Sequence, residues 1–286
     1  MHQAIKNMLD RYSLTTVNEY ENALKEIIQH VVLLGLWRSD FYIKSAFYGG
    51  SALRILYGMD RFSEDLDFTL LKPGKIKIEK CFGHIENELE AFGFKVEIEK
   101  KEKKNKSQIE SAFVKANTAI HLLQIEAPED ILWGIHKQKK IKIKLEIDID
   151  PPGKIEWENK YILEPIPFNV PVVTTSFMFA GKIHAILYRK WKNRVKGRDW
   201  YDMVWFVSQK IPVNLEHLKS RINQSENLNF THLTSEIVKK EIINTINKID
   251  IEQMKNDVLP FIKNSDAVRV WSKDFFKSVV KQIKFE

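Results

Sequence analysis

The stretch Phe47–Leu71, FYGGSALRILYGMDRFSEDLDFTLL, constrains the fold of this chain most strongly. A short apolar run leads into a glycine corner at Gly49 and Gly50, a helical segment follows, and a second apolar run begins at Asp65. Glycine tolerates positive φ and permits a close backbone approach, as a phosphate-binding turn requires. The pattern therefore predicts a strand, a helix and a second strand in close succession.

The second apolar run carries two acids, Asp65 and Asp67. In a strand this spacing places both carboxylates on one face, while Leu66, Phe68 and Leu70 enter the core. Neighbouring carboxylates repel each other unless a cation lies between them, and a divalent metal is the natural cation. The stretch therefore predicts a metal-dependent phosphoryl- or nucleotidyl-transfer site. The alternative, two solvated acids on a surface strand, is disfavoured by the adjoining glycine corner.

Composition excludes several classes of protein. Hydrophobic residues make up 44% of the 286 residues and charged residues 29%, which is typical of a globular protein. No apolar run approaches the roughly 18 residues of a membrane span, and the start of the chain lacks the apolar core of a secretory signal. The single cysteine, Cys81, excludes an intrachain disulfide and favours the cytoplasm. The net charge of +7 favours a polyanionic partner only weakly.

The first half of the chain mixes helical and strand patterns. Residues 1–45 are predicted to be helical, with a capping box at Thr16 and Glu19, and another helix is expected over Ile78–Phe92. From Phe94 onward the period is mostly two, which predicts strands over 94–100, 109–116 and 119–127 and a short helix over 129–135. The lysine-rich run 101–108 suits a solvated hairpin tip.

The segment Lys139–Asp150, KKIKIKLEIDID, has the clearest strand pattern in the chain. Its apolar face consists of isoleucines and one leucine, and its polar face carries, in order, Lys140, Lys142, Lys144, Glu146, Asp148 and Asp150. A solvated sheet face explains the lysines, but three successive acids that point the same way repel one another. This strand is therefore the expected source of a third carboxylate for the metal.

Helical patterns return beyond about Glu156. Ser176 is expected to cap the helix FMFAGKIHAILYRKW, a second helix begins after Gly197, and amphipathic segments fill residues 214–286. A basic stretch that suits an RNA backbone comprises Lys190, Lys192, Arg194, Lys196 and Arg198. The change of period predicts two domains, at 1–158 and 159–286.

Four features of the sequence occur together: FYGGSALR from Phe47, RFSEDLDF from Arg61, Lys182 in FAGKIHAIL, and RDWYD from Arg198. Together they resemble the AbiEii-type nucleotidyltransferase toxins of the DNA polymerase β-like superfamily, the enzymatic halves of bacterial toxin–antitoxin and abortive-infection pairs. The resemblance implies an α+β fold, in which a mixed sheet with flanking helices is followed by a helical C-terminal domain.

The resemblance assigns the phosphates of a bound NTP to residues of the glycine corner. Gly50, Ser51 and Arg54 are expected to bind the nucleotide. Ser51 equally suits a cap of the following helix, and Arg54 an ion pair with Glu64 or Asp65.

The resemblance also implies two Mg²⁺ ions and two residues of the helical half. Asp65 and Asp67 are expected to hold the metal and to be catalytic, with Asp148 preferred as the third ligand and Glu146 as the alternative. Lys182 is expected to neutralise charge on the nucleotide, and Asp199 is the late catalytic aspartate. For Lys182 the alternative is a surface lysine, and for Asp199 an acid stabilised by the helix dipole.

The implied reaction is transfer of nucleotides from an NTP to an RNA acceptor, expected to be the 3′ end of tRNA, which would block translation. A cognate antitoxin would be the protein partner, and no membrane would be involved. A small-molecule nucleotidyltransferase would need an acidic acceptor pocket, whereas the helical half is rich in lysine. The remaining alternatives are transfer to a protein hydroxyl and a catalytically silent nucleic-acid-binding or antitoxin-like protein, which the intact acids disfavour.

Overall fold

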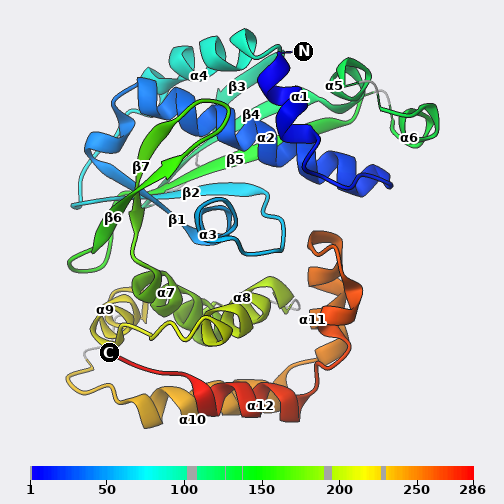
Figure 1. The fold of residues 1–286 in the computed structure, drawn as a ribbon. Coiled ribbons are helices and arrows are strands. Elements are labelled where there is room, and N and C mark those ends of the chain that lie inside the picture. The colour runs from blue at the N-terminus through cyan, green and yellow to red at the C-terminus, as the bar shows by residue number, and fades with distance from the viewer. Residues whose placement is uncertain (1, 102–107, 126, 137, 190–194, 227–229) are drawn as a thin grey trace. The chain divides into compact units, whose positions relative to one another are not determined.

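The computed structural model describes residues 2–101, 108–125, 127–136, 138–189, 195–226 and 230–286. Contacts within the chain divide it into two compact units. Figure 1 shows the chain, coloured by residue number. Unit 1 comprises Met1–Gly58, Phe62–Pro151 and Trp157–Val172. Unit 2 comprises Met59–Arg61, Pro152–Glu156 and Val173–Glu286.

Unit 1 is built on a seven-stranded mixed sheet with the strand order β3-β4-β5-β2-β1-β7-β6. β1 is antiparallel to β2 and parallel to β7, β2 is parallel to β5, and β4 is antiparallel to both β3 and β5. The strands are β1 (Ser45–Tyr48), β2 (Asp65–Leu70), β3 (Val96–Lys100), β4 (Ile109–Asn117), β5 (Lys140–Asp148), β6 (Trp157–Ile162) and β7 (Phe168–Val173). This mixed sheet with flanking helices confirms the predicted α+β class.

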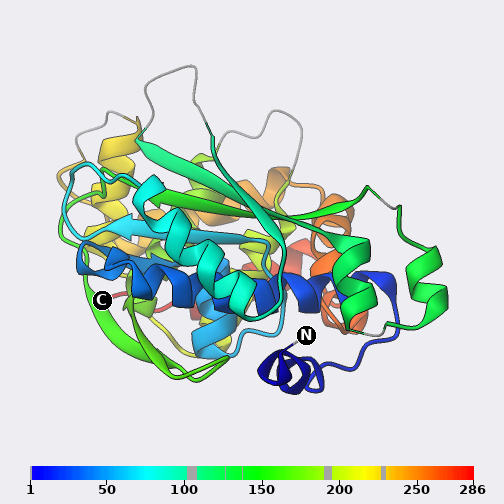
Figure 2. The same cartoon turned by 90° about the horizontal axis from the view of Figure 1, so that it is seen from above.

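Helices flank the sheet on both faces. α2 and α4 cover one face and α3 lies on the other, as Figures 1 and 2 show. The predicted capping box is confirmed at the start of α2, where the Thr16 side chain and Glu19 satisfy each other's backbone N–H groups. The helices of unit 1 are α1 (Gln3–Leu9), α2 (Val17–Arg38), η1 (Phe41–Ile43), α3 (Gly49–Tyr57), α4 (Glu79–Ala91), α5 (Thr118–Gln124) and α6 (Glu129–Trp133).

The core of unit 1 lies between the sheet and the pair α2 and α4. Leu66 and Phe68 of β2 are fully buried, as the alternation of the sequence predicts, and Ile143 of β5 is buried on the same face. α2 approaches α4 closely at Gly35, where a Cβ atom would lie 2.6 Å from Cα of Ile85. Glycine therefore sets the packing distance between these two helices.

Two predictions for unit 1 are wrong. The segment 119–127 does not form a strand, because the Asn117 side chain accepts a hydrogen bond from the Ile120 backbone N–H at 3.1 Å and α5 begins there. Helical structure does not return at Glu156, because β6 and β7 follow and join the sheet beside β1. The predicted hairpin tip at 101–108 lies almost wholly outside the described residues.

Unit 2 is helical from Thr175 onward. Thr174, and not Ser176, is the N-cap residue of α7, so the predicted capping residue is wrong by two positions. Within the described residues, no helix is long and apolar enough to cross a membrane. The helices of unit 2 are α7 (Thr175–Tyr188), α8 (Gly197–Ser208), α9 (Leu215–Glu226), α10 (Ser235–Lys248), α11 (Ile251–Val258), η2 (Leu259–Phe261), η3 (Ser265–Val268) and α12 (Lys273–Gln282).

Candidate functional site

The candidate metal carboxylates lie on β2 and β5 of unit 1. Asp65 and Asp67 share one face of β2, and both side chains are partly buried. β5 runs parallel to β2, with Glu146 opposite Asp67 and Asp148 opposite Thr69. Paired residues of neighbouring strands project to the same face of the sheet. Glu146 is therefore a nearer neighbour of Asp67 than Asp148 is. The register thus favours Glu146 over Asp148, the residue preferred from sequence, as the third carboxylate.

The donor chemistry of these residues fits Mg²⁺, which prefers carboxylate oxygens. In this structure the Glu146 carboxylate instead forms an ion pair with Lys144 at 2.5 Å. Accordingly, within the part of the chain that is described, no three Asp, Glu, His or Cys side chains are already arranged to hold a metal ion. Asp65 and Asp67 are the residues that would supply two ligands, and Glu146 would have to leave Lys144 to supply a third.

The glycine corner lies directly against this pair of acids. Gly49 has a φ of +82°, and a Cβ atom built on it would overlap the Asp67 carboxylate and lie 3.0 Å from the Asp67 Cβ. α3 begins at Gly49, and its N-cap residue Tyr48 makes no side-chain capping bond. A helix N-terminus attracts anions through its backbone N–H groups and its dipole. The corner therefore places the N-terminus of α3, an end that attracts anions, beside the Asp67 carboxylate.

Ser51 is fully buried in the first turn of α3, and its hydroxyl donates a hydrogen bond to the backbone carbonyl of Asp65. It is not the N-cap residue of the helix, so the capping alternative is wrong. The bond ties the glycine corner to the first residue of β2 and thereby positions the acid-bearing strand. A contact between Ser51 and phosphate stays a prediction.

Arg54 contacts α2 and the segment that precedes β2. Its Nε lies 2.8 Å from Glu26 Oε2, and its guanidinium lies over the ring of Phe62 at 4.5 Å from the centroid. Glu64, one of the two expected partners of Arg54, forms an ion pair with Lys25 at 3.2 Å. An ion pair of Arg54 with Glu64 or Asp65 stays a prediction. Arg54 therefore fastens α3 to α2, and its contact with a nucleotide stays a prediction.

Unit 2 contains a buried charged cluster formed by Lys182, Asp199, Asp202 and Arg61. Lys182 Nζ on α7 lies 2.9 Å from Asp199 Oδ1 and 2.8 Å from Asp202 Oδ2, both on α8. Arg61 donates to both carboxylate oxygens of Asp202, from Nε at 2.5 Å and from Nη2 at 2.7 Å. The structure thus joins the two helical residues that the sequence singled out, Lys182 and Asp199.

The cluster fixes the charge of its members. Burial would raise the pKa of Asp199, but Lys182 and Lys196 outweigh it and lower that pKa to about 2. Burial would lower the pKa of Lys182, but Asp199 and Asp202 outweigh it and raise that pKa. Both residues are therefore charged at neutral pH. The Lys182 side chain is 18% exposed whereas that of Asp202 is fully buried, so Lys182 is better able to meet a ligand.

Arg61 is the residue of this cluster to which the sequence assigned no role. It belongs to the RFSEDLDF segment, but nothing in its spacing indicates a partner on a distant helix. Beside it, the Tyr201 hydroxyl donates a hydrogen bond to Asp60 Oδ1 at 2.7 Å. α8 therefore holds the short segment Met59–Arg61 through two adjacent side chains, Tyr201 and Asp202.

The basic stretch from Lys190 to Arg198 is only partly described, because Lys190, Lys192 and Arg194 lie outside the described residues. Arg198 Nε lies 4.0 Å from Asp257 Oδ2, and the Arg198 guanidinium lies over the ring of Phe261, 4.1 Å from its centroid. Burial lowers the pKa of Lys196. Arg198 thus contacts Asp257 and Phe261, while Asp202 shares Lys182 with Asp199.

The family of the chain follows from its sequence. The sequence model of the nucleotidyl transferase AbiEii toxin, type IV toxin–antitoxin system, matches residues 31–276. The chain belongs to the AbiEii nucleotidyltransferase toxin family. The matched region contains Asp65, Asp67, Lys182 and Asp199. Membership confirms the predicted family and enzyme class, and a toxin–antitoxin family implies a cognate antitoxin as a partner.

Three solved structures are similar to this AbiEii toxin. JHP933 from Helicobacter pylori is similar with a TM-score of 0.52 at 16% identity, over 91% of this chain and 90% of that protein. A second H. pylori protein, assigned as a nucleotidyltransferase, gives a TM-score of 0.49 at 18% identity, over 89% and 90% of the two chains. A nucleotidyltransferase-like antigen from Paracoccidioides brasiliensis gives 0.42 at 16% identity, over 85% and 96%. No significant sequence match was found among curated proteins.

Proposed function

We propose that this AbiEii toxin is a Mg²⁺-dependent enzyme that transfers nucleotides from an NTP to an RNA acceptor, the 3′ end of tRNA. The observation that carries the proposal is the register of β2 and β5. It places Asp65, Asp67 and Glu146 on one face of the sheet, beside the N-terminal end of α3. Family membership supports the class of reaction, and the positive net charge of +7 agrees with a nucleic-acid acceptor.

In the proposed reaction an acceptor hydroxyl attacks the α-phosphorus of the NTP, and pyrophosphate leaves. Mg²⁺, held by Asp65 and Asp67 with Glu146 as the third ligand, would neutralise phosphate charge and lower the pKa of the attacking hydroxyl. The chain itself has to position the phosphates. The backbone N–H groups at Gly49 and Gly50 bind the terminal phosphates, because a helix N-terminus attracts anions.

Lys182 neutralises charge on the triphosphate and the departing pyrophosphate, as a compact cation can. Asp199 holds the ammonium group of Lys182 in place through the 2.9 Å ion pair and keeps it protonated, since it raises the pKa of Lys182. In this proposal Asp199 acts as a positioning residue and Lys182 contacts the nucleotide.

Nucleotides added to the 3′ end of tRNA would block its aminoacylation and hence translation. This consequence explains how such an enzyme acts as a toxin and why a cognate antitoxin has to restrain it. It also places the action of the toxin in the cytoplasm, where NTPs and tRNA are found.

The proposal is tested by incubating the full chain with Mg²⁺, total RNA and each of four α-labelled NTPs. The matched variant is Asp65→Asn/Asp67→Asn, which keeps the volume of both side chains and removes their charge. Glu90→Gln, an exposed acid on α4, is the control for loss of a carboxylate elsewhere in unit 1. We expect labelled RNA of tRNA size with the native chain and with the control, and none with the double variant.

Each other outcome contradicts part of the proposal. Label on protein would indicate transfer to a protein hydroxyl, and label on a small molecule would indicate an antibiotic-type enzyme. Equal labelling by the double variant would remove Asp65 and Asp67 from the site. Labelling that persists in EDTA would exclude the metal.

A further inference from the structure

A basic band lies on the same face of the sheet as the acids Asp65 and Asp67. We define the basic band as Lys144, Lys142, Lys140, Lys115 and Lys95. The register places Lys144 opposite Asp65 on β2. On the other side of β5, Lys142 lies opposite Lys115 of β4. The band therefore begins beside the acids and extends along β5 and across β4 towards the start of β3.

Two lysines of the band have no acidic partner. Both Lys142 and Lys95 are exposed, and neither forms an ion pair with any described residue. The other three pair with Glu97, Glu99 and Glu146 on the sheet surface. Exposed ion pairs contribute little to stability and are screened by salt, so a polyanion can compete for these lysines. Five lysines face three glutamates, which leaves the band positive.

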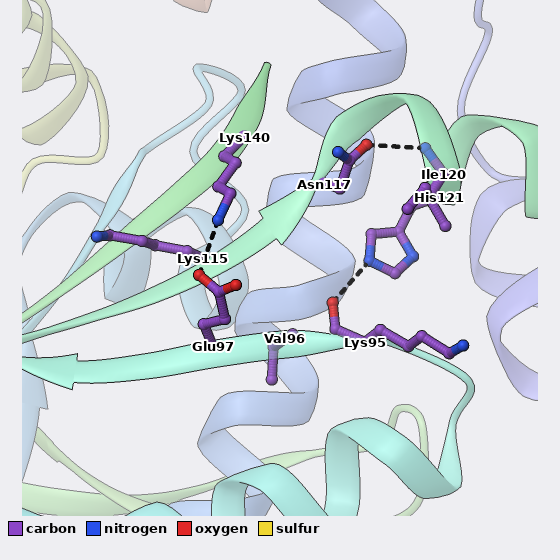
Figure 3. A pocket seen from close by; sticks show the side chains of 8 residues that line it. All are labelled: Lys95, Val96, Glu97, Lys115, Asn117, Ile120, His121 and Lys140. Carbon is purple, nitrogen blue, oxygen red and sulfur yellow. Dashed lines mark hydrogen bonds and ion pairs between the residues drawn. The ribbon is translucent and has the colours of Figure 1, made fainter. Parts of the chain in front are cut away.

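A pocket of about 350 Å³ ends the band. Figure 3 shows the side chains around it, with Lys140 reaching Glu97 from one side and Lys95 on the other. The buried His121 donates a hydrogen bond from Nε2 to the Lys95 backbone carbonyl at 3.1 Å. This bond fixes the backbone at Lys95, so the pocket has a rigid wall with a cation at its edge.

We propose that the basic band binds the phosphate backbone of the single-stranded 3′ segment of the RNA acceptor. Alternate residues of a strand are about 7 Å apart, so Lys140, Lys142 and Lys144 form a row of cations that matches an extended, regularly charged strand. The row ends beside Asp65, where the 3′ hydroxyl has to react. This inference rests on the proposed function for the reaction at that end, but the binding itself needs neither NTP nor metal.

The basic band is a different RNA-binding surface from the one that the sequence alone predicts, which is the stretch from Lys190 to Arg198. The contacts of Arg198 with Asp257 and Phe261 engage that side chain within unit 2. The basic band lies within unit 1 and is continuous with the acids through the register of β5, so it can guide a strand to them.

The test is fluorescence anisotropy with a short fluorescein-labelled single-stranded RNA and the full chain, without NTP or Mg²⁺, over a series of salt concentrations. The double variant Lys140→Ala/Lys142→Ala removes two exposed cations from the band. We expect its Kd to rise about tenfold and the slope of log Kd against log salt to fall by about 1.4, since each phosphate contact on a single strand contributes about 0.7.

Two further variants sharpen the test. Lys77→Ala/Lys80→Ala removes two exposed cations around the start of α4, the helix that covers the opposite face of the sheet, and leaves the net charge equal to that of the double variant. It should bind RNA almost as the native chain does. Glu97→Gln frees Lys140 from its 2.7 Å ion pair and should tighten binding. Circular dichroism of each variant confirms that the fold is retained.

Binding and transfer separate this inference from the proposed function. If both lysine pairs weaken binding equally, or neither does, the basic band is overturned. A Lys140→Ala/Lys142→Ala variant that labels RNA with an unchanged KM also overturns it, while the proposed reaction stands. RNA binding that depends on the band, without nucleotide transfer by the native chain, supports the band and contradicts the proposed reaction.

Discussion

Lys182 lies between two aspartates of one helix, 2.9 Å from Asp199 and 2.8 Å from Asp202, and the two acids differ in their other partners. Asp202 is fully buried and receives two hydrogen bonds from Arg61. Asp199 Oδ2 lies 3.5 Å from Nη1 of Arg189, and the Arg189 side chain is 45% exposed. We infer that Asp202 serves the stability of unit 2, whereas Asp199 lines a pocket together with Arg189 and Lys196.

Substitution of the two aspartates should therefore separate stability from activity. Asp202→Asn removes the negative charge that Arg61 and Lys182 share inside unit 2. It should lower the free energy of unfolding by about 3–5 kcal/mol. Asp199→Asn should cost less stability and abolish toxicity, because Lys182 loses the group that positions it. Urea denaturation and growth after induced expression measure the two effects.

Asp266→Asn serves as the control for both variants. Asp266 is 59% exposed in a surface pair with Arg269, so its loss should change stability by less than about 0.5 kcal/mol and leave growth arrest intact. Lys182→Ala should also relieve growth arrest. A fully toxic Asp199→Asn or Lys182→Ala chain would remove that residue from the reaction.

A methyl group at Gly49 should disable the site. Gly49→Ala forces an alanine into a φ of +82° and against the Asp67 carboxylate, so we expect a loss of about 1–3 kcal/mol in stability and of most nucleotide transfer. Gly83→Ala in the middle of α4 is the matched control, because its Cβ would meet no atom within 4 Å. It should be neutral or stabilise the chain by up to about 1 kcal/mol. Thermal denaturation and the labelling assay compare the two.

The third metal ligand can be identified by comparing Glu146→Gln with Asp148→Asn. The register places Glu146 opposite Asp67, so Glu146→Gln should reduce nucleotide transfer by at least about a hundredfold, while Asp148→Asn should retain most of it. The labelling rate at saturating Mg²⁺ measures both, and the Mg²⁺ concentration for half-maximal rate should rise only for Glu146→Gln. The reverse order of effects would restore Asp148 as the ligand.

The local pattern around the acids was predictable because each part of it is determined by nearby residues. The two-residue spacing of Asp65 and Asp67, the glycine corner and the alternation of β5 each follow from backbone geometry. The choice between Glu146 and Asp148 was not predictable, because the register of two parallel strands depends on how the whole sheet packs. The same holds for Arg61, whose partner Asp202 is far away in the sequence.

The wrong predictions have physical causes as well. The segment 119–127 alternates like a strand, yet a cap at Asn117 starts a helix there, so a local hydrogen bond outweighs the pattern. β7 carries the run FNVPVV, whose buried positions are nearly continuous because both of its faces are covered. Such a run cannot be distinguished from a buried helix by periodicity alone. The ring of Trp37 packs against that of Phe168, with 6.1 Å between the ring centroids, and helps to hold this strand in unit 1.

Acid should destabilise unit 2 through two histidines, His184 and His217. Burial, reinforced by Arg221, lowers the pKa of His184 to about 4 and that of His217 to about 3. In the unfolded chain both titrate near 6.5. The unfolded state therefore binds more protons below that pH, and folding stability falls as the pH decreases from about 6.5 towards 4.

From pH 7 to pH 5 the expected loss is about 2 kcal/mol for each histidine. His217→Gln cannot bind this proton, so its free energy of unfolding should vary less with pH by about that amount, even if it is lower at pH 7. His232→Gln, at an exposed position, is the control and should follow the native curve. Urea denaturation at pH 7 and pH 5 makes the comparison, and a His217→Gln chain with the native pH dependence would show that other groups cause the acid sensitivity.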